Sequence, residues 1–305
     1  MSQRKVSLSI GGLQRKYGDE EAIRFAKSIG CDAVDFDTCH PVYDYRKPDS
    51  IFAKSDDEII TYYTNLKNIA DSIGLEIGQT HGRIEGFTDD PQWNDAMVKN
   101  ARLDFLVAKT LGAPVCVVHS VTTCRMGPEC PSKTMHDLNF DMFCKYLDLA
   151  KQYGIKIATE TFGDAPSKKC CDFFGNTTEF LKSYNRVAAV GNNADYFVMC
   201  ADTGHSNKAT RFNNNPSPAD AIRMMGSKIE VLHLNDNDTL TDQHKIPLTG
   251  CIDWNDVFDA LDEIGYKGVY NMELSLGHFG KDFEKQTAEF AVKVMRHFLD
   301  TRYGA

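Results

Sequence analysis

Short apolar runs of strand length alternate along the chain with longer segments in which apolar residues recur every three or four positions. The short runs predict buried β-strands, and the longer segments predict amphipathic helices. The predicted strands cover residues 5–10, 33–36, 75–80, 115–118, 155–160, 196–202, 231–236 and 268–273. The predicted helices cover residues 19–29, 55–73, 91–111, 134–153, 176–184, 219–225, 254–264 and 283–299.

Signals at the helix ends support these assignments. Ser55 and Glu58 have the spacing of a capping box, in which each side chain accepts a hydrogen bond from the other residue's backbone amide. Asp253 is the expected N-cap of the helix at 254–264, and Gly112 follows another helix as a stop signal.

The alternation of strands and helices predicts a fold of the α/β class with a parallel sheet. Eight strand–helix units favour closure into a (β/α)8 TIM barrel over an open sheet. No linker or change in composition divides the sequence, so residues 1–305 are predicted to form a single barrel domain. Gly11-Gly12, directly after the first strand, is expected to form a tight turn rather than a phosphate-binding loop.

Four of the predicted strands end in side chains that bind metals in proteins. Glu160, Asp202, His233 and Glu273 each stand at the carboxyl end of a strand. In a parallel barrel these ends converge on one pocket. Three carboxylates and one imidazole suit Mn²⁺, Zn²⁺, Co²⁺ or Mg²⁺, whereas an iron–sulfur site would need thiolates. The pattern therefore predicts that these four residues hold one divalent metal ion.

Further polar residues are expected around this quartet at the mouth of the barrel, where TIM-barrel enzymes bind their substrates. They stand at the ends of the third and fourth strands or in the loops after the sixth and seventh. The candidate substrate-binding residues are His81, His119, His205, Asp242, His244 and Lys245. The sequence leaves open whether the histidines bind hydroxyl groups or further metal ions. Lys208 and Arg211 are predicted to lie in a nearby loop, either against an anionic group of the substrate or in solvent.

The composition is that of a folded globular protein, with 42% hydrophobic and 25% charged residues. A net charge of −9 argues against a nucleic-acid partner, because phosphate binding depends on Lys and Arg. The ten cysteines include no CxxC pair, which favours reduced thiols. With neither a membrane-length apolar run nor a signal-peptide pattern, we expect a cytoplasmic protein. Exposed helices of barrels commonly pair with those of a second copy, so the sequence leaves open whether the protein forms a homo-oligomer.

Several motifs at the strand ends resemble those of the xylose isomerase-like barrels. They are Glu160-Thr161, Asp202-Thr203-Gly204-His205, His233-Leu234-Asn235-Asp236, Asp242-Gln243-His244, Gly250-Cys251-Ile252-Asp253-Trp254 and Tyr270-Asn271-Met272-Glu273. This group includes sugar-phosphate isomerases and epimerases, ketose 3-epimerases, inosose dehydratases and the endonuclease IV enzymes. The resemblance spans essentially the whole chain. It implies that Glu160 and Glu273 act as proton carriers on opposite sides of a sugar, and that His205 contacts the substrate.

The resemblance implies a metal-dependent isomerase or epimerase that acts on a sugar or keto-cyclitol through an enediolate. Ketose 3-epimerases carry a further glutamate six positions after the first one and an arginine six positions after the metal-binding histidine. Here these positions hold Pro166 and Thr239, so the pattern departs from that particular reaction. A dehydratase or lyase begins with the same proton abstraction, and the residues do not separate it from an isomerase.

The alternative from another class is a trinuclear zinc phosphodiesterase of the endonuclease IV type, acting on abasic DNA. All nine zinc ligands of those enzymes have a counterpart here, namely His81, His119, Glu160, Asp202, His205, His233, Asp242, His244 and Glu273. The residues at 82–85 do not resemble the stretch that those enzymes place against DNA, and Ser120 stands where they have proline. Together with the net charge, these differences favour a small-molecule substrate. A barrel that binds a sugar without turning it over is the third possibility.

Overall fold

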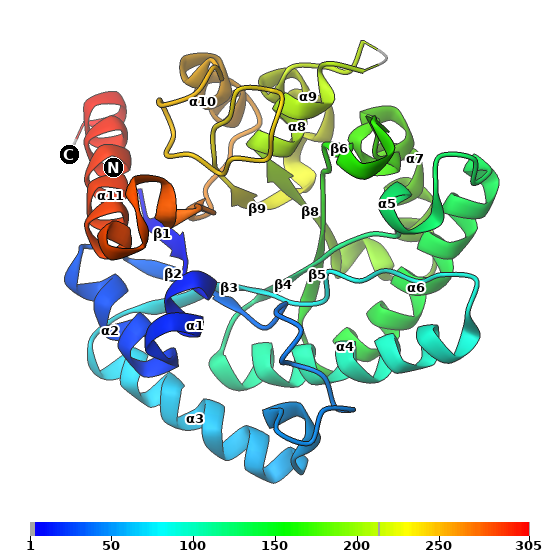
Figure 1. Cartoon of the computed structure of the whole chain (residues 1–305), viewed down its shortest axis with the longest axis horizontal. Coiled ribbons are helices and arrows are strands. Elements are labelled where there is room, and N and C mark those ends of the chain that lie inside the picture. Colours follow the sequence, from blue (N-terminus) through cyan, green and yellow to red (C-terminus); the bar gives the residue numbers. More distant parts are fainter. Residues whose placement is uncertain (1–3, 213, 305) are drawn as a thin grey trace.

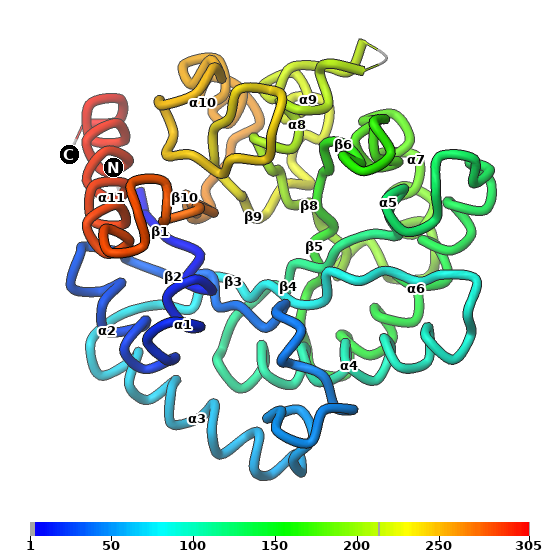
Figure 2. The backbone as a smooth tube through the Cα atoms, viewed as in Figure 1, coloured from blue at the N-terminus to red at the C-terminus, as the bar shows by residue number. Residues whose placement is uncertain are grey.

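The computed structural model describes residues 4–212 and 214–304 and shows a barrel of parallel strands within a ring of helices (Figures 1 and 2). Residues 1–3, 213 and 305 belong to the predicted single domain but lie outside the described residues. The barrel strands are β1 (Val6–Ser9), β2 (Ala33–Asp37), β3 (Glu76–His81), β4 (Val115–Val118), β5 (Lys156–Glu160), β8 (Phe197–Asp202), β9 (Ile229–His233) and β10 (Tyr270–Met272). All eight predicted strands are confirmed.

The strands follow the order β10-β1-β2-β3-β4-β5-β8-β9 in one parallel sheet. The two outer strands of this order, β9 and β10, meet through a parallel bridge between Leu234 and Met272. The backbone amide of Leu234 donates to the carbonyl of Asn271 at 2.9 Å, and that of Glu273 donates to the carbonyl of Leu234 at 3.2 Å. These bonds close the barrel, as predicted.

The outer ring contains the eight predicted helices, with ends that differ by a few residues from those expected. They are α2 (Asp19–Ser28), α3 (Asp56–Ser72), α4 (Pro91–Leu111), α6 (Ser132–Tyr153), α7 (Thr177–Ala188), α9 (Pro218–Met225), α10 (Trp254–Glu263) and α11 (Glu284–Tyr303). The capping box at Ser55 forms, and Asp253 accepts hydrogen bonds from the first amides of α10. None of the described helices is both long and apolar enough to cross a lipid bilayer.

Two separate apolar layers hold the barrel together. The larger one fills the space between the strands and the helices. The smaller one consists of compact side chains at alternate positions of neighbouring strands, and we assign it to the barrel interior. Its members are Val115, Val117, Ala158, Val198, Cys200 and Val231. Successive side chains of a strand point to opposite faces, which is why the two layers draw on alternating positions of the same strands.

Several short elements at the carboxyl ends of the strands were not predicted. They are α1 (Gly11–Tyr17), α5 (Thr123–Met126), α8 (Thr203–Ala209) and a two-stranded hairpin of β6 (Asp164–Ala165) and β7 (Cys170–Cys171). The tight turn expected at Gly11-Gly12 is wrong, because these residues open α1. A side chain at Gly11 would place its Cβ 2.1 Å from Asp37 Oδ2, so the glycine permits a close approach of α1 to β2.

Candidate metal centre

The alternation of side chains places three of the predicted metal ligands inside the barrel. Glu160, Asp202 and His233 each stand two residues after a member of the interior apolar cluster. They therefore point to the same face, one layer closer to the mouth. Glu273 follows β10 directly, across the closing bridge from β9. Apolar packing below thus positions the polar layer above.

The four side chains converge as the sequence predicts. Glu160, Asp202, His233 and Glu273 offer ligand atoms that all lie within 4.8 Å of one another. His233 Nδ1 lies 3.0 Å from Glu160 Oε1 and 3.3 Å from Glu273 Oε2. Asn235 Nδ2 donates to Asp202 Oδ2 at 3.0 Å and orients that carboxylate. Oxygen and imidazole donors at this spacing fit a divalent cation.

The electrostatics of the quartet also fit a cation. Burial raises the pKa of Glu160, but the charges of His233 and His119 outweigh it and hold that pKa well below its usual value. Burial also raises the pKa of Glu273, but the charges of His233 and His244 outweigh it, so this pKa is lowered as well. At Asp202 burial dominates, and together with the other carboxylates it raises the pKa to about 7.

Asp35, the middle residue of β2, supports His233 from behind and was not among the predicted site residues. Its Oδ2 lies 3.3 Å from His233 Nε2 and accepts a hydrogen bond from Ser9 Oγ at 2.8 Å. Gln79 Nε2 donates to the same oxygen at 3.2 Å. A carboxylate bound to the Nε2–H of an imidazole leaves Nδ1 free for a metal. A carboxylate between the apolar residues Val34 and Phe36 of a buried strand was the signal that could have identified it.

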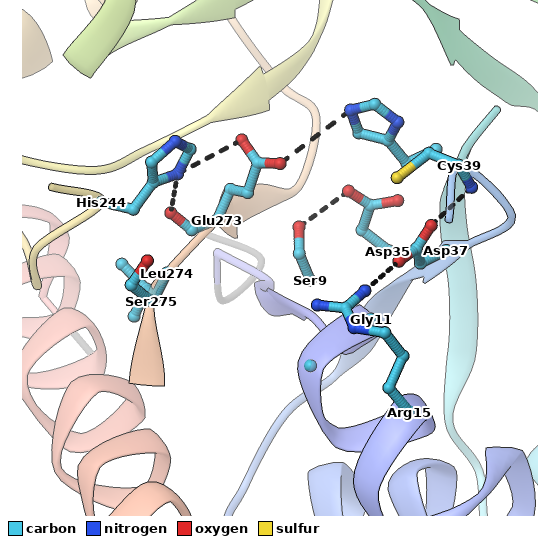
Figure 3. Close-up of a pocket in the computed structure, with 12 residues that line it drawn as sticks. Ser9, Gly11, Arg15, Asp35, Asp37, Cys39, His244, Glu273, Leu274 and Ser275 are labelled. Atoms are coloured by element: carbon cyan, nitrogen blue, oxygen red, sulfur yellow. Dashed lines mark hydrogen bonds and ion pairs between the residues drawn. The ribbon is translucent and has the colours of Figure 1, made fainter. Parts of the chain in front are cut away.

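A pocket of about 210 Å³ opens beside the quartet, over β1, β2 and β10 (Figure 3). Its lining is mostly polar. The lining residues are Ser9, Gly11, Gly12, Arg15, Asp35, Asp37, Cys39, His81, His244, Glu273, Leu274 and Ser275. Arg15 Nη1 donates to Asp37 Oδ2 at 2.8 Å on its wall, and Glu273 faces it from the opposite side. Hydroxyl groups of a small ligand would find both donors and acceptors here.

Two of the predicted substrate-binding histidines border Glu160. His119 Nε2 lies 3.0 Å from Glu160 Oε2, and His81 Nε2 lies 3.7 Å from the same oxygen. The two imidazoles are 3.3 Å apart at their Nε2 atoms. Phe162, which was not predicted, packs its edge on His119 and stacks on His205 at 5.3 Å. It forms an apolar surface next to the polar centre.

The remaining predicted residues lie further out at the mouth. His205, Asp242 and His244 form a second group with ligand atoms within 4.8 Å of one another, and we call this group the outer triad. Asp242 Oδ2 lies 3.5 Å from His205 Nε2 and 3.3 Å from His244 Nε2. Lys245 is partly exposed, and its backbone pairs with Asp236 in both directions. Within the described residues its ammonium has no ion pair with this site, so its substrate contact stays a prediction.

Asp236 fixes the loop that carries the outer triad to the barrel. This buried carboxylate accepts hydrogen bonds from Trp254 Nε1 at 2.8 Å and from the amide of Gly250 at 3.0 Å. Its other oxygen accepts from the amides of Asn237 at 2.9 Å and Ile252 at 3.2 Å. The two ends of the loop are thus tied to one side chain. The ring of Trp254 is buried and packs under this anchor.

Comparison with known proteins identifies the family of the barrel. The family described as xylose isomerase-like TIM barrel matches residues 23–297 of the chain. The inosose isomerase of Bacillus subtilis (strain 168) is 29% identical over 196 residues, which are 62% of each protein. The inosose isomerase of Bacillus velezensis is 30% identical over 156 residues, or 49% of each protein. The chain therefore matches less than two thirds of the length of these curated relatives.

Solved structures share the fold over nearly the whole length. A D-tagatose 3-epimerase-like protein superposes with a TM-score of 0.72 at 20% identity, covering 97% of both chains. The IOLI protein, solved with a zinc atom, superposes with a TM-score of 0.68 at 18% identity, covering 99% of this chain and 100% of that one. With the family match, the closed barrel and the converging strand-end residues, the chain belongs to the xylose isomerase-like TIM-barrel family.

Proposed function

We propose that the protein is a divalent-metal-dependent isomerase or epimerase that acts on a sugar or keto-cyclitol. The observation that supports this proposal most is the convergence of Glu160, Asp202, His233 and Glu273 beside a pocket of small-molecule size. The inosose isomerase relatives and the structural similarity to epimerases support the same class of reaction.

The four residues of the quartet would hold the ion. When bound, it would polarise a substrate carbonyl and stabilise negative charge on the oxygen while the neighbouring C–H proton leaves. Zn²⁺ is supported by the zinc in the IOLI structure, and Mn²⁺, Co²⁺ and Mg²⁺ remain candidates on the donor set.

Glu273 is the proposed base that faces the substrate. Its side chain is 24% exposed and lines the pocket, whereas that of Glu160 is fully buried. The lowered pKa of Glu273 keeps it ionised at neutral pH and able to accept a proton. Glu160, bordered by the histidines, is proposed to deliver or take the proton on the other side. His81, His119, His205, Asp242, His244 and Lys245 are proposed to bind the substrate's polar groups.

The test measures proton abstraction directly. The purified protein, loaded with Zn²⁺ or Mn²⁺, is incubated in D₂O with a panel of ketoses and keto-cyclitols, and deuterium entry next to the carbonyl is followed by NMR. Glu273→Gln should lower the exchange rate by about 10²- to 10⁴-fold with the fold retained. Glu230→Gln is the matched control, because Glu230 pairs with Lys156 at the opposite end of the barrel strands. Retention of most exchange by Glu273→Gln would remove it from this role.

The same samples distinguish the proposed isomerase or epimerase from two other activities. A dehydratase would release water from the substrate, which mass spectrometry detects. A trinuclear zinc phosphodiesterase is the second candidate because His81, Glu160 and His233 also group within 4.8 Å, as does the outer triad. It would hold three zinc ions per chain and cleave abasic DNA. Binding of a sugar without exchange, dehydration or DNA cleavage would support the binding-protein alternative.

A further inference from the structure

The outer triad contains the donor atoms of a metal site, but a lysine lies against it. Lys208 extends from α8, three residues after His205, and is only 3% exposed. Its Nζ lies 3.6 Å from Asp242 Oδ1, while the other oxygen of Asp242 faces the two imidazoles. From its sequence context Lys208 was predicted to lie in a loop, against either an anionic group of the substrate or solvent. The structure instead buries it on a helix, with protein carboxylates around it.

A second carboxylate fixes the ammonium in this position. Asp164 Oδ1 lies 2.7 Å from Lys208 Nζ, and Asp164 Oδ2 lies 2.7 Å from Arg211 Nη2. The side chain of Asp164 is 7% exposed, and its position follows from the β6–β7 hairpin. A buried lysine held by a neighbouring carboxylate cannot swing out into water without leaving that carboxylate partly unpaired.

The carboxylates of the inner quartet have a different environment. Within the described residues, the ion pairs of Glu160, Asp202 and Glu273 are all with histidines. No lysine or arginine of the described chain supplies a permanent positive charge to them. Their negative charge is therefore available to a metal ion, whereas the charge of Asp242 is shared with a resident ammonium.

We propose that Lys208 takes the place of a metal ion at the outer triad and limits the site to the single ion of the quartet. This inference rests on the proposed function, because it assumes that the quartet binds a metal. An ion held by His205, Asp242 and His244 would share one carboxylate with the ammonium and lie a few ångströms from it. Like charges at that separation repel, and the burial of the Lys208 side chain limits how far water can screen this repulsion. The triad then remains free to hydrogen-bond to polar groups of a substrate.

The experiment counts zinc ions per chain after loading and desalting, by inductively coupled plasma mass spectrometry. Wild-type protein and Lys208→Arg, which keeps the charge, should hold one ion. Lys208→Leu should hold two, because the ammonium is gone while Asp164 keeps its pair with Arg211. Adding His244→Ala to Lys208→Leu should return the count to one and locate the second ion. Lys208→Met provides the same test if the leucine variant fails to fold.

Each outcome separates the two proposals. One ion in both wild-type and Lys208→Leu protein would overturn the role of Lys208 and leave the proposed function standing. Two or three ions in the wild-type protein would also overturn it and favour the phosphodiesterase. A wild-type chain that holds no zinc would instead overturn the metal centre of the proposed function. Absorption of the Co²⁺-loaded proteins checks the same point, since a second cobalt site in Lys208→Leu adds its own d–d bands.

Discussion

Removal of the Asp35 carboxylate should weaken metal binding although Asp35 is not one of the four proposed ligands. Asp35 Oδ2 has four donors around it, from Ser9 at 2.8 Å, Gln79 at 3.2 Å, His233 at 3.3 Å and Asn271 at 3.4 Å. Its pKa is lowered because the hydrogen bond and charge of His233 outweigh burial, so it is a carboxylate at neutral pH. It therefore holds the ring of His233 in the orientation and tautomer that a metal needs.

The expected size of the effect follows from these contacts. Asp35→Asn can keep the four donors by turning its amide oxygen toward them, because Asp35 Oδ1 has no hydrogen-bond partner among the described residues. Only the charge is lost, and we expect metal affinity to fall about tenfold. Asp35→Ala loses the contacts as well, and we expect a loss of about a hundredfold, or about 2.7 kcal/mol.

The assay is competition for Zn²⁺ against a fluorescent chelator at a fixed pH and salt concentration. Asp37→Asn is the matched control, because Asp37 lies on the same strand but pairs with Arg15 rather than with His233. Its zinc affinity should stay within a factor of three of wild type. Zinc binding by Asp35→Ala within that same factor would refute the positioning role.

Three further outcomes are expected. Because burial and its neighbours raise the pKa of Asp202 to about 7, Asp202 carries a proton below that pH, and the ion must displace it. Zinc affinity should therefore weaken as the pH falls from about 8 to about 6, which is about one unit on either side of this pKa. A zinc affinity that does not change with pH would contradict this. A metal concentration of about 100 times the Kd should raise the free energy of unfolding by about 2.7 kcal/mol. For a chain of 305 residues this is a rise of about 4 °C in Tm, which calorimetry should detect and a chelator should reverse. In Asp236→Asn the side-chain NH₂ group would face two of the four buried donors, which would then have no acceptor. The free energy of unfolding, measured by urea denaturation, should fall by about 3 kcal/mol. The exposed Asp238→Asn should change it little, and equal losses in both variants would exclude the anchor.

The barrel and the quartet could be predicted because both depend on local patterns. Glu160, Asp202 and His233 end apolar strands, and parallel strands bring their ends together whatever the details of the loops. The loops depend instead on contacts between distant residues. Asp164, for example, forms its ion pair with Lys208, which lies 44 positions further along the chain.

The short helices were missed for a related physical reason. The helix α8 has seven residues, too few for a clear apolar periodicity. Its first turn is capped by the Asp202 side chain, which accepts a hydrogen bond from the amide of His205. Asp202 was predicted as a metal ligand but not as a helix cap, so the position of Lys208 was not predicted. Asp35 was passed over because its supporting role requires the geometry of His233 on a strand far from it in sequence.

The place where the barrel closes gives the metal centre a consequence for assembly. β9 contributes His233 and the segment after β10 contributes Glu273, and these two strands join at the edge where the first and last parts of the sheet meet. A cation held by both side chains would link the two strands at that joint from inside the barrel. Because Glu273 directly follows β10, the four side chains would come together around an ion only after β10 has joined both β1 and β9.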